Sequence, residues 1–246
     1  MKNESKRRGI IKTGINFLDE NGAVEYGAIS VLTGPAASGK TTKSIQIAIN
    51  LGYIDNKKVL YLSSKEHRLS NELAFLRMIT EQHGKKICRK HYELYFDKEK
   101  LKKIDSEDFN VLNMINIAIV ARELKDLNVN FASFDGKNFA ALEHLLEEDD
   151  YDVVIIDSGY TLHQTPEVRL SQQEFCSKLC KASYPQAFVV TAPLSYRELK
   201  YEEDVCREDL ERSKAGKVLS QNAKCVIGLK VFYIHEDDES KTIAVL

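Results

Sequence analysis

The stretch that decides the fold reads Gly34-Pro35-Ala36-Ala37-Ser38-Gly39-Lys40-Thr41. It follows an apolar run, Ala28 to Leu32, and precedes a segment with helical spacing, Lys43 to Leu51. A buried strand, a loop with glycine at both ends and a helix, in this order, are the parts of a phosphate-binding loop. The glycines let the backbone approach phosphate closely, and the N–H groups at the helix N-terminus direct partial positive charge toward it.

This loop predicts the residues that bind a nucleoside triphosphate and its magnesium ion. Lys40 is expected to reach the β- and γ-phosphates, and the Thr41 hydroxyl is a suitable ligand for Mg²⁺, which prefers oxygen. Asp157 ends the apolar run that begins at Val153, so its carboxylate is expected at the carboxyl edge of a buried strand, where ligands bind in such sheets. We predict Thr41 and Asp157 as metal ligands. The predicted nucleotide-binding residues are Gly34, Pro35, Ala36, Ala37, Ser38, Gly39, Lys40, Thr41 and Thr42.

Hydrolysis also requires a group that orients or deprotonates water. Glu66 follows the strand pattern Val59 to Ser63 and is the candidate for this role. The predicted catalytic residues are therefore Lys40, Glu66 and Asp157. A surface glutamate without a catalytic role explains the same position equally simply.

The rest of the chain predicts an α/β fold. Short apolar runs alternate with segments of helical spacing, which indicates a mostly parallel central sheet flanked by helices. The further strands are expected at Val129 to Phe134, Val153 to Asp157 and Phe188 to Thr191, and the further helices at Asn71 to His83, Phe109 to Leu127 and Phe139 to Leu146. Two runs near the end, Cys225 to Ile234 and Thr242 to Leu246, flank an acidic turn and predict a C-terminal antiparallel hairpin. We expect a basic tail over residues 1–12 and a single domain over residues 13–246.

Composition excludes several classes of protein. The chain has 246 residues, of which 43% are hydrophobic and 29% charged, as in soluble globular proteins, and no apolar run is long enough to span a membrane. The formal charge of −2 gives no overall positive field for nucleic acid, so such contacts would depend on local clusters. The five cysteines form no Cys-x-x-Cys pair and follow no secretory leader. We expect a cytoplasmic or nucleoid-associated protein that is not secreted.

The order of these motifs resembles that of P-loop ATPases of the RecA superfamily, in particular the ATPase domain of DnaB-type replicative helicases, with KaiC- and RadA-like proteins as relatives. The resemblance covers nearly the whole chain. It rests on the loop and on the segments Thr13 to Asp19, Val59 to Glu66, Tyr151 to Asp157, and Asp209 to Leu229. It implies a RecA-like fold, ATP and Mg²⁺ as cofactors, and assembly as a homo-oligomer or as a hetero-oligomer with another RecA-like subunit.

Three features depart from the family pattern. Glu66 falls one position after the family's catalytic glutamate, where Lys65 stands. Ala192 and Pro193 follow the strand after which the family places a polar sensor, for which Thr191 is a weak substitute. The family's C-terminal arginine finger has no counterpart before Leu246. These departures favour a neighbouring subunit that completes the site.

The resemblance also implies that two loops, Gly159 to Gln173 and Leu194 to Lys217, face single-stranded DNA. The candidate DNA contacts are Arg169, Arg197, Lys200, Arg207, Arg212 and Lys214. Acidic residues are interleaved with them, so solvated, salt-bridged loops are the alternative. The leading hypothesis is a helicase-like, DNA-dependent ATPase in replication or recombination. The alternatives are an accessory RecA-like paralogue that binds ATP and works through protein contacts, and a small-molecule kinase, for which no lid or acceptor pocket is identified.

Overall fold

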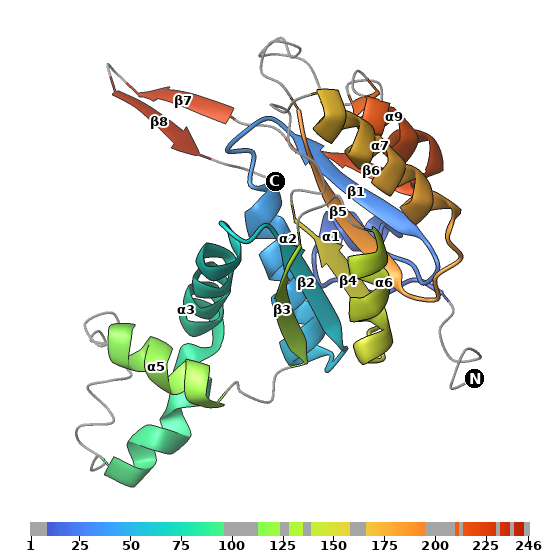
Figure 1. Ribbon diagram of the computed structural model, residues 1–246. Coiled ribbons are helices and arrows are strands. Elements are labelled where there is room, and N and C mark those ends of the chain that lie inside the picture. The colour runs from blue at the N-terminus through green and yellow to red at the C-terminus, as the bar shows by residue number, and fades with distance from the viewer. Residues whose placement is uncertain are drawn as a thin grey trace.

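The computed structural model describes residues 9–95, 113–123, 128–134, 139–157, 166–194, 210–211, 214–229, 232–236 and 239–243. At its centre lies a six-stranded sheet of order β3-β2-β4-β5-β1-β6, in which all neighbouring strands are parallel (Figure 1). The strands are β1 (Ile29–Gly34), β2 (Val59–Ser63), β3 (Val129–Ser133), β4 (Val153–Ile156), β5 (Ala187–Pro193) and β6 (Cys225–Gly228). The expected α/β class with a parallel central sheet is confirmed.

Helices cover both faces of this sheet (Figure 1). One face carries α1 (Asn16–Glu20), α2 (Lys40–Ile49) with the π-helical turn η2 (Asn50–Ile54), and α3 (Arg68–Tyr95), against which α5 (Asn113–Glu123) packs. The other face carries α6 (Phe139–Glu148), α7 (Pro166–Lys181) and α9 (Lys214–Asn222). Each layer of helices therefore contributes to its own hydrophobic core.

Alternation along the strands explains why two cores form. On β2, Tyr61 packs in the core below α2 and α3, whereas its neighbours Leu60 and Leu62 pack in the core below α6 and α7. On β4, Val153 and Ile155 belong to the first core. Successive strand side chains point to opposite faces, so a strand buried on both faces is a continuous apolar run. The next residue on the α2 face after Ile155 is Asp157, where β4 ends.

Helix α3 shows how the sequence selects its buried face. Asn71, Phe75 and Ile79 are buried and lie four residues apart, so they share one face of the helix, while Arg77 and Glu81 are exposed. The buried face has one polar member, Asn71, at the end nearest the carboxyl edge of the sheet. At 28 residues α3 is much longer than the expected Asn71 to His83. No helix in the described ranges combines the length and the apolar character needed to cross a bilayer.

The C-terminal part differs from the expectation in one respect. The predicted antiparallel hairpin is present as β7 (Phe232–Glu236) and β8 (Glu239–Ile243), which form a separate two-stranded sheet. The run expected as one strand, Cys225 to Ile234, is divided between β6 and β7. Its first part pairs in parallel with β1, and this pairing stops after Gly228 because β1 itself turns into the loop at Gly34.

The N-terminal segment is tied to the core by a carboxylate. The Asp19 carboxylate accepts hydrogen bonds from the backbone N–H groups of Thr13 and Gly14, at 2.6 and 3.0 Å, and from the Thr13 hydroxyl at 2.8 Å. Asn50, at the start of η2, donates to the Thr13 carbonyl at 2.7 Å. Of the expected basic tail, residues 1–8 lie outside the described part, whereas Ile11 is buried and its N–H donates to the Val24 carbonyl.

Candidate nucleotide-binding site

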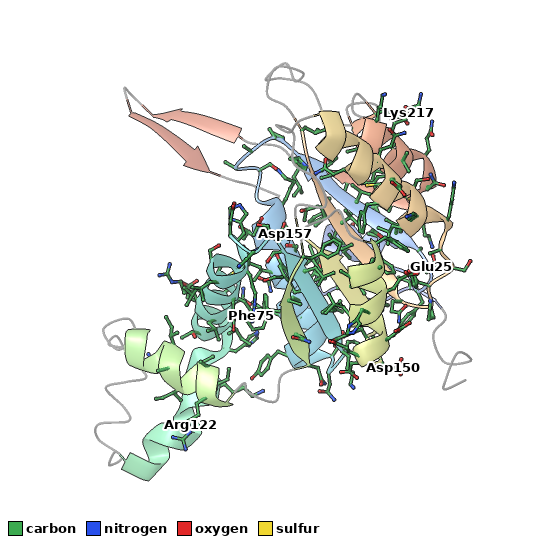
Figure 2. All side chains as sticks on the ribbon, viewed as in Figure 1. Glu25, Phe75, Arg122, Asp150, Asp157 and Lys217 are labelled. Atoms are coloured by element: carbon green, nitrogen blue, oxygen red, sulfur yellow. The ribbon has the colours of Figure 1, made fainter. Side chains whose placement is uncertain are left out.

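The strand order brings the predicted site residues together at the carboxyl edge of the sheet. Strand β5 lies between β4 and β1, so Asp157 after β4, Thr191 on β5 and the loop after β1 meet at one place. Figure 2 shows Asp157 where the central strands end beside α2 and α3. This position, outside the carboxyl ends of parallel strands, is where open α/β sheets bind ligands.

The loop at residues 34–39 has the shape of a phosphate cradle. A Cβ atom on Gly34 would lie 2.5 Å from the Leu229 carbonyl oxygen and 2.5 Å from Ser38 Oγ, so only glycine fits there. Gly39 has a φ of 82°, in the left-handed region, and it immediately precedes α2. Gly39 places no side chain over the helix N-terminus, so the N–H groups of the first turn face the loop without a capping side chain. These features fit the binding of an anionic phosphate group.

The Lys40 ammonium lies inside this loop. Its Nζ donates to the carbonyl oxygens of Gly34 and Pro35, at 2.9 and 2.6 Å, and to Ser38 Oγ at 3.3 Å. Burial lowers the pKa of Lys40 from its usual value to about 8, and the negative charge of Asp157 opposes part of this shift. A bound anion would oppose it further, so the site is suited to stabilise the charged lysine when phosphate binds.

Asp157 is the centre of a buried hydrogen-bond network and is 5% exposed. Its Oδ1 accepts from the hydroxyls of Thr41, at 3.2 Å, and Thr191, at 2.8 Å. Its Oδ2 accepts from the Tyr61 hydroxyl and from Asn71 Nδ2, both at 3.0 Å. The structure thus brings together Thr41 and Asp157, the two residues that the sequence predicts as magnesium ligands.

Sequence reasoning did not identify Tyr61 and Asn71 as site residues. Tyr61 looked like one more apolar residue of a buried strand, and Asn71 like the first residue of a helix. Burial raises the pKa of the Tyr61 phenol well above its ordinary value, and the charge of Asp157 adds to this effect, so the hydroxyl remains a hydrogen-bond donor. The signal that was present is polar character on a buried face, since Tyr61 and Asp157 share one face of the sheet and Asn71 shares a helix face with Phe75.

Glu66 lies in the turn between β2 and α3 and is exposed. It is not among the described residues that bind the carboxylate of Asp157. Its role as general base stays a prediction. Nearer to Asp157, Ser63 ends β2 one register position beyond the Leu62–Ile156 pair. Its hydroxyl is buried and has no hydrogen-bond partner among the described residues, so it is available to bind water or a ligand.

The expected DNA contacts fall mostly outside the described part of the chain, as Arg197, Lys200, Arg207 and Arg212 do. The boundaries of both expected loops need correction. Residues 166–173 belong to α7, so the backbone of Arg169 is helical, and Lys214, which is exposed, is the first residue of α9. The physical reasons are local: Pro166 suits the first position of a helix, and the buried residues Ala215 and Leu219 lie four residues apart, on one face of α9.

Comparisons with known proteins agree with this geometry. No family model matches the chain, and no curated protein matches it in sequence. The chain is similar to the solved structure of an ATPase domain, that of a DnaB-like helicase, with a TM-score of 0.56 and 14% sequence identity, over 95% of this chain and 80% of that one. At this identity the likeness shows the fold alone and no particular subfamily. The chain therefore has the fold of a RecA-like P-loop ATPase domain.

Proposed function

We propose that this protein binds ATP with Mg²⁺ and hydrolyses it, as a RecA- and DnaB-like ATPase that acts on single-stranded DNA in replication or recombination. The observation that carries the proposal is the 3.2 Å contact between Thr41 Oγ1, at the start of α2, and Asp157 Oδ1, at the end of β4. These residues are 116 positions apart in the sequence, and a hydroxyl beside a carboxylate at the mouth of a phosphate-binding loop is a suitable pair of magnesium ligands.

The residues of the site have separate roles in this proposal. The backbone N–H groups of residues 36–41 and the Lys40 ammonium bind the phosphates, and Gly34 and Gly39 give the loop its close approach. Thr41 and Asp157 hold Mg²⁺, which would bridge the terminal phosphates and neutralise charge that develops during transfer. Thr191 donates to Asp157 Oδ1 and so helps to fix the carboxylate. Glu66 is the proposed group that orients or deprotonates water.

The DNA contact and the assembly belong to the finer part of the proposal. The resemblance to DnaB-type helicases supports loops that grip single-stranded DNA in a nucleotide-dependent manner, through basic residues such as Lys214 at the start of α9. Assembly with a second copy or with another RecA-like subunit would supply the basic group that completes the site. The exposure of Glu66 at the mouth of the loop region is compatible with either arrangement.

Two observations favour the accessory paralogue as a second candidate. Glu66 is exposed and does not contact Asp157, and Thr191 is already bound to Asp157. A site of this kind binds nucleotide well and positions water poorly, because tight phosphate contacts and a placed base are separate requirements. Such a protein would work through contacts with other proteins.

The test is ATP hydrolysis by the purified protein, measured with and without single-stranded DNA and alongside Lys40→Ala. Hydrolysis that DNA stimulates and Lys40→Ala abolishes is the expected result. Binding of ATP without hydrolysis in either condition would contradict the motor and favour the accessory paralogue. Failure to bind ATP at all would contradict both.

A further inference from the structure

We infer that Tyr61 and Asn71 are positioning residues of the magnesium site, which fix the Asp157 carboxylate through Oδ2 and so direct Oδ1 toward Thr41 and the ion. The inference rests on the proposed nucleotide site and adds to it two residues outside the phosphate-binding loop. One comes from the middle of β2 and the other from the first turn of α3. Neither residue is expected to touch the nucleotide.

Each oxygen of Asp157 accepts from two donors, and the two pairs differ in kind. Oδ2 is occupied by Tyr61 and Asn71, each at 3.0 Å and both buried. A carboxylate oxygen accepts about two hydrogen bonds, so Oδ2 has no remaining capacity for a metal ion or its water. Oδ1 is bound by Thr191 and by Thr41, and Thr41 is itself a predicted metal ligand. Only Oδ1 is therefore placed to serve the ion.

The Tyr61 hydroxyl also connects Asp157 to the helix that carries Thr41. It lies 2.8 Å from Ser44 Oγ, and the Ser44 hydroxyl lies 2.9 Å from the Thr41 carbonyl oxygen. An ionised carboxylate can only accept, so the single phenol proton of Tyr61 is donated to Asp157. Tyr61 thus sets the distance between β4 and the first turn of α2, the two elements that supply the predicted magnesium ligands.

Asn71 holds the carboxylate from the helical layer. Its side chain is 7% exposed and shares the buried face of α3 with Phe75 and Ile79, which pack in the core below the sheet face. The amide cannot move away without displacing that face of the helix. Tyr61 from the sheet and Asn71 from the helix together prevent rotation of the carboxylate about its last bond. Residues that orient a metal ligand in this way commonly change metal affinity by about 10- to 100-fold when they are removed.

The experiment measures magnesium-dependent binding of a fluorescent ATP analogue, which requires no turnover. Binding to wild type, Tyr61→Phe and Asn71→Leu is titrated in Mg²⁺ and, separately, in EDTA. Tyr61→Phe removes one hydroxyl, and Asn71→Leu replaces the amide by an apolar group of similar size. We expect the Mg²⁺ concentration for half-maximal enhancement to rise by about tenfold or more in each variant, with the affinity in EDTA unchanged. The phosphate-binding loop itself is intact in both variants, which is why the EDTA value is expected to hold.

Tyr151→Phe is the matched control. Tyr151 is also a buried tyrosine whose hydroxyl takes part in one side-chain hydrogen bond, with Asn130 Nδ2 at 2.8 Å, but it lies at the opposite end of β4 from Asp157. Its loss should leave both the Mg²⁺ requirement and the affinity in EDTA at the wild-type values. Thermal unfolding establishes that each variant is folded. If Asn71→Leu does not fold, Asn71→Ser, a smaller change, takes its place.

The outcomes separate this inference from the proposed function. An unchanged Mg²⁺ requirement in folded Tyr61→Phe and in the folded Asn71 variant overturns the inference and leaves nucleotide binding intact. An equal loss of affinity in EDTA and in Mg²⁺ also overturns it, because the residues then support the loop and not the metal site. A wild-type protein that binds no nucleotide in either condition contradicts the proposed function, and the inference with it.

Discussion

The affinity for nucleotide should fall as pH rises above the pKa of Lys40. In the free protein burial lowers this pKa from its usual value to about 8, whereas a bound triphosphate adds negative charge beside the ammonium and raises the pKa again. At pH 7 Lys40 is charged in both states and contributes no pH dependence. Above the lowered value the free protein loses the proton and the complex retains it, so binding must take up a proton.

The magnitude follows from this difference in pKa. Linkage of a single proton raises Kd by at most tenfold per pH unit, which gives about 30-fold between about pH 7 and about pH 9.5 for a free-state pKa of about 8. The same sign applies to stability: the folded free protein binds fewer protons at Lys40 than the unfolded chain, so its free energy of unfolding rises with pH from about 8 toward the usual lysine pKa.

The assay is titration of a fluorescent ATP analogue across this pH range, with calorimetry in two buffers of different ionisation enthalpy to count the protons taken up. Lys40→Arg is the control, because a guanidinium stays charged throughout. Its affinity is expected to be lower at neutral pH and to change little with pH. A wild-type Kd that is constant up to about pH 9.5, or a slope that Lys40→Arg shares, would show that this lysine is not linked to binding.

Three further predictions concern single residues of the site. Gly34→Ala places a methyl group 2.5 Å from the backbone oxygen of Leu229, so it should lower the free energy of unfolding by about 1–3 kcal/mol and weaken nucleotide binding; an unchanged melting temperature would contradict the tight packing of the loop. Ser63→Ala removes a buried hydroxyl that has no partner among the described residues, so urea denaturation should give an equal or higher stability, by up to about 1 kcal/mol; a marked loss would mean that the hydroxyl is satisfied in solution. Asp157→Asn keeps the shape and turns one acceptor oxygen into an amide donor that faces two other donors, so it should cost about 1–3 kcal/mol of stability and abolish the Mg²⁺ enhancement of nucleotide binding; retention of that enhancement would exclude Asp157 as the metal ligand.

Agreement between sequence and structure is best where the signal is local. Strand β2 begins and ends where the apolar run Val59 to Ser63 predicts, because a strand buried on both faces must be apolar at each position. Agreement is poorer where a partner decides. The run Cys225 to Ile234 is apolar over most of its length, yet β6 ends at Gly228, since its pairing with β1 stops where β1 turns into the phosphate-binding loop.

By itself the sequence determined the strand, loop and helix of the phosphate-binding motif, the parallel α/β class, and the pairing of Thr41 with Asp157, because each depends on patterns within a few residues of the chain or on the shared edge of parallel strands. Only the tertiary structure decided which other groups reach Asp157. Tyr61 and Asn71 are 96 and 86 positions away from it, and no local pattern joins them. They meet because the order β2-β4 in the sheet and the packing of α3 above it place two donors beside one carboxylate oxygen. The same packing leaves Glu66, which the sequence placed at the reaction, in an exposed turn.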